Sequence, residues 1–414
     1  MAGAKGSDDK AKSSKQQTAG NLSEEIEEGL GSLPIMRIAE VFYLLSHQQS
    51  LQSTLDKGDA TYRNELMQYI KSNKMAPYYK YVCNQLHWPI DAELLANLKK
   101  ENKDEAVQLD EKIEDATKNL GDIEVLETLL AKARMHCRIG DKEAAIQAFA
   151  VANEKPQSIN QKILVSLHCI RIGLFFNDLE LVKERIRQAT LLIDEGGDWD
   201  RRNRLKVYEG CYLMMARDFK KACVLFQESA ATFTATELMN YDQLVFYCVV
   251  TCVLSMNRVE LKKKIVDSPE ILAVLHHTPY LENFLNGLYD CNYKVFFTAM
   301  VELYPHILRD KYLSIHSRYI IREYRVLAYS QFLEAYRSVT MESMANAFGI
   351  SVTFLDAELS RFIAAGRLNA KIDKVNGVIE TNRPDSKNAQ YQAAIKKGDV
   401  VLNRIQKLTR AINV

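Results

Sequence analysis

The chain has 414 residues, of which 47% are hydrophobic and 26% are charged, and its formal net charge at pH 7 is +1. This length and composition predict a globular protein of two or three domains. The nearly balanced charge excludes a global electrostatic attraction to nucleic acid or to an acidic membrane surface, so partners must be recognised by local surfaces.

The sequence carries no signal for secretion or for a membrane. No window approaches the roughly 18 unbroken apolar residues of a membrane span, and the N-terminus lacks the apolar core of a secretory signal. The eight cysteines include no CxxC pair and mostly lie in apolar helical stretches. This pattern favours reduced, buried thiols over disulfides, so we expect an intracellular protein in a reducing compartment and no membrane contact.

The first 121 residues divide into a polar tail and a helical region. Residues 1–30 are expected to be a disordered tail, because their polar start holds too little apolar content to offset the entropy of ordering. Residues 31–121 are predicted to be helical from about Pro34. One face of this first helix is apolar and carries Ile35, Ile38, Ala39, Phe42 and Leu45.

A long, highly charged helix is predicted from Asp91 to Leu120. Its apolar positions recur at offsets of 3, 4, 3 and 4 residues and are Ala106, Leu109, Ile113, Ala116 and Leu120. Two interpretations are open, a solvated helix that rests one narrow stripe on its neighbours and a free-standing coiled coil. Fewer than three strong heptads are present, which favours the solvated helix.

Residues 122–310 repeat one theme, in which an apolar helix is followed by a tight break and a second helix. The breaks are Gly140-Asp141, Asn177-Asp178, Arg217-Asp218 and Asn257-Arg258. Positions 141, 178, 218 and 258 are separated by 37, 40 and 40 residues. These spacings lie near the period of tetratricopeptide-like helical hairpins, and they predict one right-handed superhelix of stacked hairpins.

Short helices are predicted over 269–276, 279–289 and 292–304, and they lead into a helix over 316–337. Residues 311–385, which include this last helix, are predicted to form a winged helix. Thr340 can cap a helix over 341–348 that stops at Gly349. Ser351 can cap a second helix that Gly366 ends, and the apolar stripe of this helix comprises Val352, Leu355, Leu359 and Phe362. Alternating residues 368–372 and 378–380, joined by Asn376-Gly377, predict a two-stranded hairpin.

Winged helices often bind DNA, but the charge of this one opposes that role. Residues 339–385 carry five basic and six acidic side chains, and the second helix has Asp356 and Glu358 against Arg361 alone. Phosphate neutralisation supplies most nucleic-acid affinity, so we predict a protein-binding module and no nucleic acid. The expected contact is the hairpin edge, formed by Leu368, Ala370, Ile372, Val378, Ile379 and Glu380.

Residues 386–414 are predicted to form a terminal amphipathic helix. Its apolar stripe consists of Val401, Ile405, Leu408 and Ile412. The stripe can fold back on the domain or dock on partner helices. Docking is favoured because Lys396-Lys397-Gly398 interrupts the helical pattern and could release the last turns.

A charge run between residues 198 and 206 has two interpretations. It can be an acidic helix start followed by a solvated basic turn, which the helix dipole would favour. It can also be an ion-pair patch between subunits, carried by Arg201, Arg202 and Arg204.

We find no pattern that predicts catalysis, a cofactor or a metal. The sequence has no Gly-x4-Gly-Lys-Ser/Thr loop, no HExxH and no His-x-His. His136-Cys137 and His168-Cys169 are neighbours on helices, where adjacent side chains diverge. The sequence therefore predicts a protein that is not an enzyme.

A solenoid of helical hairpins capped by a winged helix and a terminal helix resembles the PCI family of scaffold subunits. The resemblance covers residues 34–414. It is most specific in two runs, which are similar to PCI subunits of the 26S proteasome lid: EGGDWDRRNRLKVY at 195–208 and ELSRFIAAGRLNAKIDKVNGVIETNRPDSKN at 358–388.

The resemblance implies a noncatalytic scaffold in a hetero-oligomer that supports ATP-dependent degradation of ubiquitinated proteins in the cytoplasm and nucleus. In this family the winged helices associate in a horseshoe and the terminal helices form a bundle. The implied partners are other PCI subunits of the lid, the ubiquitin-removing subunit and the ATPase ring. The signalosome and the translation initiation scaffold share this architecture, and a PCI protein of messenger-RNA export would bind nucleic acid instead.

Overall fold

The computed structural model describes residues 31, 33–47, 59–382 and 386–412, so the predicted tail at 1–30 lies outside the described residues. The chain divides into two compact units. Unit 1 comprises Met1–Glu282 and Val301–Arg318, and unit 2 comprises Asn283–Met300 and Tyr319–Val414. The sequence predicted one boundary, after residue 310, between the repeats and the winged helix. In the structure the chain passes from unit 1 to unit 2 after Glu282, returns to unit 1 at Val301 and enters unit 2 again at Tyr319. The exact domain boundary therefore stays a prediction.

The described part of unit 1 begins with four helices. They are α2 (Met36–Ser46), α4 (Asp59–Ser72), α5 (Ala76–Leu86) and α6 (Ala92–Asn119). The side chain of Asp91 caps α6 by accepting from the N–H groups of Glu93 and Leu94.

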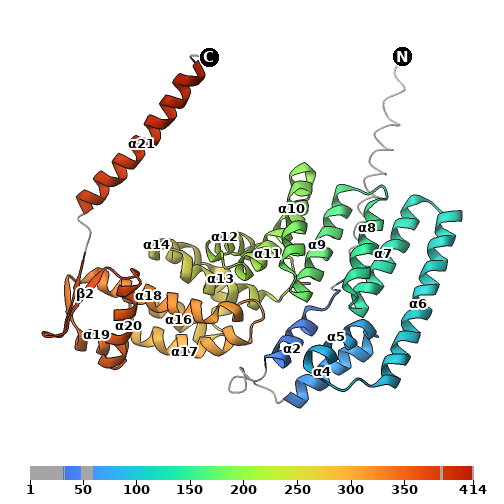
Figure 1. Cartoon of the computed structure of the whole chain (residues 1–414), viewed down its shortest axis with the longest axis horizontal. Coiled ribbons are helices and arrows are strands. Elements are labelled where there is room, and N and C mark those ends of the chain that lie inside the picture. The colour runs from blue at the N-terminus through green and yellow to red at the C-terminus, as the bar shows by residue number, and fades with distance from the viewer. Residues whose placement is uncertain (1–30, 32, 48–58, 383–385, 413–414) are drawn as a thin grey trace. The chain divides into compact units, whose positions relative to one another are not determined.

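Helix α6 contacts α5 and rests one stripe on α7 (Asp122–Ile139), and its remaining faces lie in solvent (Figure 1). Ala116 is buried in this contact, whereas Leu120 is exposed. Two ion pairs join the helices, one from Lys132 to Asp110 at 2.6 Å and one from Arg138 to Glu105 at 2.5 Å. The interpretation as a solvated helix is confirmed.

The predicted hairpins follow in order along unit 1 (Figure 1). Each pair packs its two helices against each other, and the pairs are α7 with α8 (Lys142–Asn153), α9 (Ile159–Phe176) with α10 (Leu179–Gly196), and α11 (Trp199–Met215) with α12 (Phe219–Ala230). The last repeat is α13 (Tyr241–Ser255) with α14 (Arg258–Leu261), the π-helix η1 (Lys262–Val266) and α15 (Pro269–Leu275).

Three of the four predicted breaks share one local structure. Gly140, Asn177 and Arg217 each adopt a left-handed conformation, with φ of 75°, 61° and 66°. The aspartate that follows each of them caps the next helix through its side chain. A left-handed residue closes the first helix, and the aspartate satisfies free N–H groups of the second. The fourth break differs, because Asn257 is extended and makes no side-chain cap.

Buried polar groups accompany the apolar core of unit 1. Arg171 on α9 is 3% exposed, and its guanidinium donates to the Tyr208 hydroxyl at 3.1 Å. It also donates to the carbonyls of Gly31 and Leu33, at 3.0 and 3.1 Å. Its other terminal nitrogen lies 3.6 Å from a carboxylate oxygen of Glu237. Arg171 thereby ties the segment before α2 to the repeats.

Helix α9 is the one helix in the described part of the chain that is long and apolar enough to cross a membrane by length and composition. It is 72% buried inside the protein, as the core helix of a folded unit would be. The predicted free thiols are confirmed, and seven of the eight cysteines are buried. The prediction of burial is wrong for Cys291, which is exposed in the turn after α16 (Pro279–Tyr289).

Unit 2 is a winged helix with an aromatic core. Its elements are the end of α16, the start of α17 (Tyr293–Arg309), α18 (Ser317–Ala335), β1 (Ser338–Thr340), α19 (Met341–Phe348), α20 (Val352–Ala364), β2 (Ala370–Asp373), β3 (Val378–Thr381) and α21 (Ser386–Ile412). Phe348 stacks on Tyr293 with ring centroids 4.8 Å apart, and its edge meets Phe297 and Tyr329 at 5.1 and 4.9 Å. These contacts join α17, α18 and α19 into one core.

Candidate protein-interaction surfaces

Helices α19 and α20 begin and end at the residues that their capping side chains and glycines predicted. The Thr340 hydroxyl accepts from the N–H of Ser343 at 3.3 Å, and Gly349 follows α19 with φ of 68°. The Ser351 hydroxyl accepts from the N–H of Phe354 at 3.3 Å. Leu355, Leu359 and Phe362 are buried, but Val352 at the start of α20 is exposed, so the predicted apolar stripe is wrong at this position.

The sheet of the wing has three antiparallel strands in the order β1-β3-β2, so the prediction of a two-stranded hairpin is incomplete. The additional strand is Ser338–Thr340, in which Val339 pairs with Ile379. On the other side of β3, Ile372 also pairs with Ile379. Strand β3 therefore bonds on both sides and is the central strand.

This order corrects the predicted edge. Val378, Ile379 and Glu380 lie on the central strand, so placing them at an edge was wrong. The side chains of Leu368, Ala370 and Ile379 are buried within unit 2, where they hold the sheet to the helices. The half-buried Ile372 and Val378 and the exposed Glu380 are the predicted residues whose side chains reach the surface.

Strands β1 and β2 are the two edges of the sheet, and β2 is the edge that carries predicted residues. The N–H of Asn382 donates to the carbonyl of Asn369 at 2.9 Å. Hydrogen-bonded pairs alternate along an antiparallel ladder, so Lys371 and Asp373 bond to β3. The backbone N–H and carbonyl of Ile372 therefore point away from β3, where an added strand could pair with them.

The two acidic side chains of α20 are paired within unit 2, and Arg361 is the one basic residue in its sequence. Glu358 is buried, pairs with Arg325 on α18 and accepts from the Tyr329 hydroxyl at 3.1 Å. Asp356 pairs with Lys374 at 3.0 Å. The surface of this helix therefore has no excess of basic side chains with which to bind phosphate.

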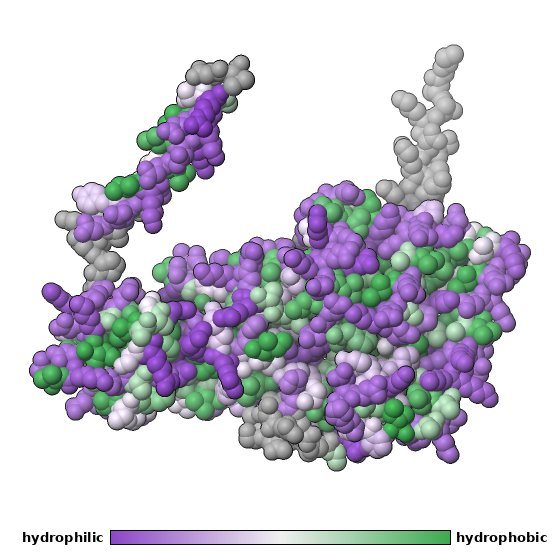
Figure 2. Space-filling model, viewed as in Figure 1, coloured by the Kyte–Doolittle hydropathy of each residue, from purple (hydrophilic) through white to green (hydrophobic). Residues whose placement is uncertain are grey.

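Helix α21 is continuous from Ser386 to Ile412, so the predicted interruption at Lys396-Lys397-Gly398 is wrong. Hydrophobic residues remain on its surface (Figure 2). The predicted stripe is exposed at all four positions, by 53% at Val401, 59% at Ile405, 64% at Leu408 and 72% at Ile412. Four such side chains on one helix form a candidate docking face for partner helices.

The predicted arginine patch is largely internal. Arg201 is buried and pairs with Asp198, the N-cap residue that precedes α11. Arg204 pairs with Asp200 at 2.9 Å. Of the three arginines, Arg202 is exposed and Arg204 is half-buried, so the predicted surface position is wrong for Arg201, and a contact between subunits through the other two stays a prediction.

The described residues contain no group of three or more histidine, cysteine or acidic side chains that could hold a metal ion. The buried thiols are also poorly suited to act as nucleophiles. Burial raises the pKa of the Cys169 thiol to about 11, and the pKa of the buried Cys137 thiol is raised further. Burial also lowers the pKa of the neighbouring His168.

Three family models match the chain in series. They are the 26S proteasome subunit RPN7 at residues 91–264, the PCI domain at 301–383, and the C-terminal helix of the 26S proteasome regulatory subunit RPN7/PSMD6 at 390–412.

Curated relatives match along nearly the whole length of the chain. A 26S proteasome non-ATPase regulatory subunit 6 homolog of Arabidopsis thaliana is 48% identical over 92% of this chain and 97% of its own length. The 26S proteasome non-ATPase regulatory subunit 6 of Dictyostelium discoideum is 44% identical over 94% of this chain and 100% of its own length. The 26S proteasome regulatory subunit RPN7 of Saccharomyces cerevisiae is 36% identical over 94% of this chain and 96% of its own length.

Proposed function

Since the chain belongs to the family of 26S proteasome non-ATPase regulatory subunit 6, also named RPN7, we propose that it is a noncatalytic scaffold subunit of the proteasome lid. The observation that carries this proposal is the series of matches, which covers the repeats, the wing and the terminal helix in one chain. In this role the protein contributes surfaces to the degradation of ubiquitinated proteins, and other subunits contribute the chemistry.

Two surfaces of unit 2 are suited to assembly. The outer side of β2 offers backbone groups to a strand of a neighbouring PCI subunit. The apolar stripe of α21 offers exposed aliphatic side chains to a helical bundle. Burying four such side chains contributes on the order of 6–10 kcal/mol before the cost of ordering the helix, which is enough to support assembly.

The proposed partners are the other PCI subunits of the lid, with the deubiquitinase subunit and the ATPase ring as further neighbours. The proposed location is the cytoplasm and the nucleus. The paired acidic side chains of α20 support the absence of nucleic acid from this set.

Affinity purification of the tagged full-length chain from its own cells tests the proposal. We expect the other lid subunits to co-purify in equal amounts and to be identified by mass spectrometry. Recovery of signalosome subunits, translation initiation subunits or messenger RNA in their place would contradict it.

The noncatalytic role needs its own assay. We expect the purified chain to hold no stoichiometric zinc by elemental analysis and to leave a ubiquitin conjugate uncleaved in a single-turnover assay. Cleavage that persists after the chain is separated from all other subunits would overturn this part of the proposal.

A further inference from the structure

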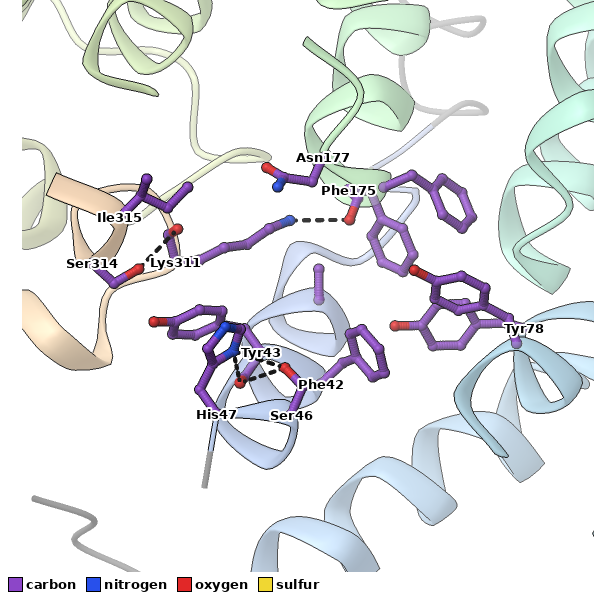
Figure 3. Close-up of a pocket in the computed structure, with 13 residues that line it drawn as sticks. Phe42, Tyr43, Ser46, His47, Tyr78, Phe175, Asn177, Lys311, Ser314 and Ile315 are labelled. Atoms are coloured by element: carbon purple, nitrogen blue, oxygen red, sulfur yellow. Dashed lines mark hydrogen bonds between the residues drawn. The ribbon is translucent and has the colours of Figure 1, made fainter. Parts of the chain in front are cut away.

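Unit 1 encloses a cavity of about 320 Å³ that the scaffold function does not use (Figure 3). The end of α2, the middle of α5, the end of α9 and residues 311–315 form its walls. Six phenylalanine and tyrosine rings and the imidazole of His47 line it, and the six rings belong to Phe42, Tyr43, Tyr78, Tyr81, Phe175 and Phe176.

Contacts among these rings hold the cavity open. Phe175 packs against Tyr78 and Phe176, with ring centroids 5.2 and 5.0 Å apart, and Phe42 lies 5.7 Å from Tyr81. Tyr78 and Phe175 are buried, whereas Tyr81 at the rim is exposed. The cavity is thus a preformed apolar site with an opening to solvent, and its volume is typical of small-molecule pockets.

A buried cation lies in one wall of the cavity. The Lys311 side chain extends past the cavity to the end of α9, where its Nζ donates to the carbonyls of Leu174 and Phe175 at 2.6 and 3.0 Å (Figure 3). An ammonium group has three N–H donors, so these two bonds leave one. In the described part of the chain, no carboxylate forms an ion pair with Lys311.

The adjacent carboxylate is committed elsewhere. Asp310 accepts from the Tyr247 hydroxyl at 2.5 Å and from the N–H groups of Tyr312 and Leu313 at 2.8 and 2.9 Å. Burial lowers the pKa of Lys311 to about 8, although the nearby carboxylates of Glu40 and Asp310 act electrostatically in the opposite direction. The lysine is still mostly charged at neutral pH, and its partners are neutral carbonyls.

We propose that this cavity binds a carboxylate carried on an aromatic or branched aliphatic group. The rings enclose the apolar group, and Lys311 supplies the counter-charge and a hydrogen bond to the carboxylate. A buried charge is stable only when it is paired, so each ion compensates the other. The ligand is either a free organic acid or the C-terminal carboxylate of a peptide that ends in an apolar residue.

The test compares 3-phenylpropionate with its neutral amide, titrated into the full-length chain and followed by ligand-observed NMR. We expect the acid to bind at least tenfold more tightly than the amide. The variant Lys311→Met should reduce the affinity for the acid to that for the amide. The variant Tyr81→Ala at the rim should weaken both, whereas Tyr336→Ala, an exposed tyrosine in unit 2, should weaken neither.

Equal affinity for acid and amide, or no binding of the acid to the folded wild-type chain, would overturn the proposal. Unchanged binding of the acid by a folded Lys311→Met variant would do the same. If circular dichroism shows that this variant does not fold, Phe176→Trp replaces it, because the larger ring fills the cavity and should abolish binding of the acid. Unchanged binding by Phe176→Trp would then overturn the proposal.

A second pair of probes separates the two sources of the ligand. An acetylated tripeptide that ends in phenylalanine is titrated with a free and with an amidated C-terminus. Tighter binding of the free-carboxylate peptide than of 3-phenylpropionate assigns the site to chain termini, and the reverse order assigns it to small organic acids.

Discussion

Single polar residues buried in unit 1 hold together segments that are distant in the sequence. Arg171 is the strongest case, because one guanidinium serves a hydroxyl, a carboxylate and two carbonyls from three segments. Asp310 and Lys311 act in the same way on α13 and α9. Replacing such a residue leaves several buried groups unsatisfied at once, so its cost should exceed that of an apolar truncation of similar size.

The first residue-scale prediction concerns this guanidinium. Arg171→Met should lower the free energy of unfolding by roughly 3–5 kcal/mol, because it leaves Glu237 and two carbonyls without their buried partner. Urea unfolding of the full-length chain, followed by circular dichroism, measures the change. The matched control is Arg202→Met, which removes an exposed arginine and should change stability by less than about 0.5 kcal/mol. Equal effects of the two variants would contradict the prediction.

Asp310 gives a prediction for pH. Burial raises the pKa of this carboxyl from its usual 3.8 to about 6. Between these values the folded state binds the proton and the unfolded state does not, so stability falls as the pH rises through this window. Relative to Asp310→Asn, which cannot ionise, the wild-type chain should lose about 3 kcal/mol between pH 3.5 and pH 7. A stability difference between the two chains that is the same at both pH values would refute this.

At the scale of elements, three hairpins share one turn, in which a left-handed residue is followed by a capping aspartate. Only one of these three turns has glycine as its left-handed residue. A Cβ atom at Gly140 would lie 2.8 Å from the Cβ of Tyr78 on α5. Asn177 and Arg217 adopt the same conformation with full side chains. The packing of α5 against this turn, in addition to the backbone conformation, therefore selects glycine at the first repeat.

Gly140→Ala should consequently destabilise the chain by roughly 2–3 kcal/mol, from left-handed strain and the contact with Tyr78 together. Asn177→Gly places glycine in the same conformation without such a contact and should change stability by less than about 0.5 kcal/mol. Thermal unfolding of the two variants beside the wild type measures both. A Gly140→Ala variant as stable as the wild type would show that α5 can move away from the turn.

The sheet gives a second prediction at this scale. Ile372→Pro removes an N–H that points away from β3, and edge positions of this kind tolerate proline. We expect the isolated chain to keep its stability and helical circular dichroism and to lose co-purification with its PCI neighbours. Lys371→Pro removes an N–H that bonds to β3 and should destabilise unit 2 itself. Normal co-purification of Ile372→Pro would exclude strand pairing at this edge.

Local signals account for what the sequence predicted well. Thr340, Ser351 and Gly349 act on their own helix ends, so the bounds of α19 and α20 follow from neighbouring residues. Strand β1 was missed because it has three residues and its partner lies about forty residues downstream. Gly398 was misread because one glycine costs a helix only about 1 kcal/mol, which a long helix can absorb.

Among the predicted sites as well, those that depend on one element were found and those that depend on how elements pack together were not. The stripe on α21 is a property of one helix and was found from its period. The burial of Arg201 and the central position of β3 depend on which elements pack together, and a charge run or an alternating pattern does not carry that information. Arg171 and Lys311 were missed for the same reason, since their partners lie more than a hundred residues away.

For the whole molecule, stability and assembly are expected to depend on different residues. The core residues of both units are buried, whereas the described side chains of α21 are exposed. Loss of α21 therefore removes none of the buried side chains that the structure describes. The helix can be free for partners without a cost to the rest of the chain.

Deletion of residues 386–414 should leave the melting temperature of the isolated chain within about 2 °C of the wild type, because an exposed helix adds little to the core. The same deletion should prevent incorporation into the lid, measured by co-purification with the other lid subunits. A control with Lys396 and Lys397 changed to alanine keeps the apolar stripe and should assemble normally. A large loss of thermal stability, or normal incorporation of the truncated chain, would contradict the prediction.

The pairing of β1 with β3 also has a consequence for how such modules can be exchanged. The N–H of Thr381 donates to the carbonyl of Arg337 at 2.9 Å, and the Thr381 hydroxyl donates to the carbonyl of Tyr336 at 2.8 Å. The chain therefore enters and leaves the wing at nearly the same point, about 5.5 Å apart between Cα atoms in a pair of this kind. A segment with adjoining ends can be cut out and replaced by a homologous one without changing the length of the connections. Residues 337–381 are thus a natural unit for chimaeras between relatives.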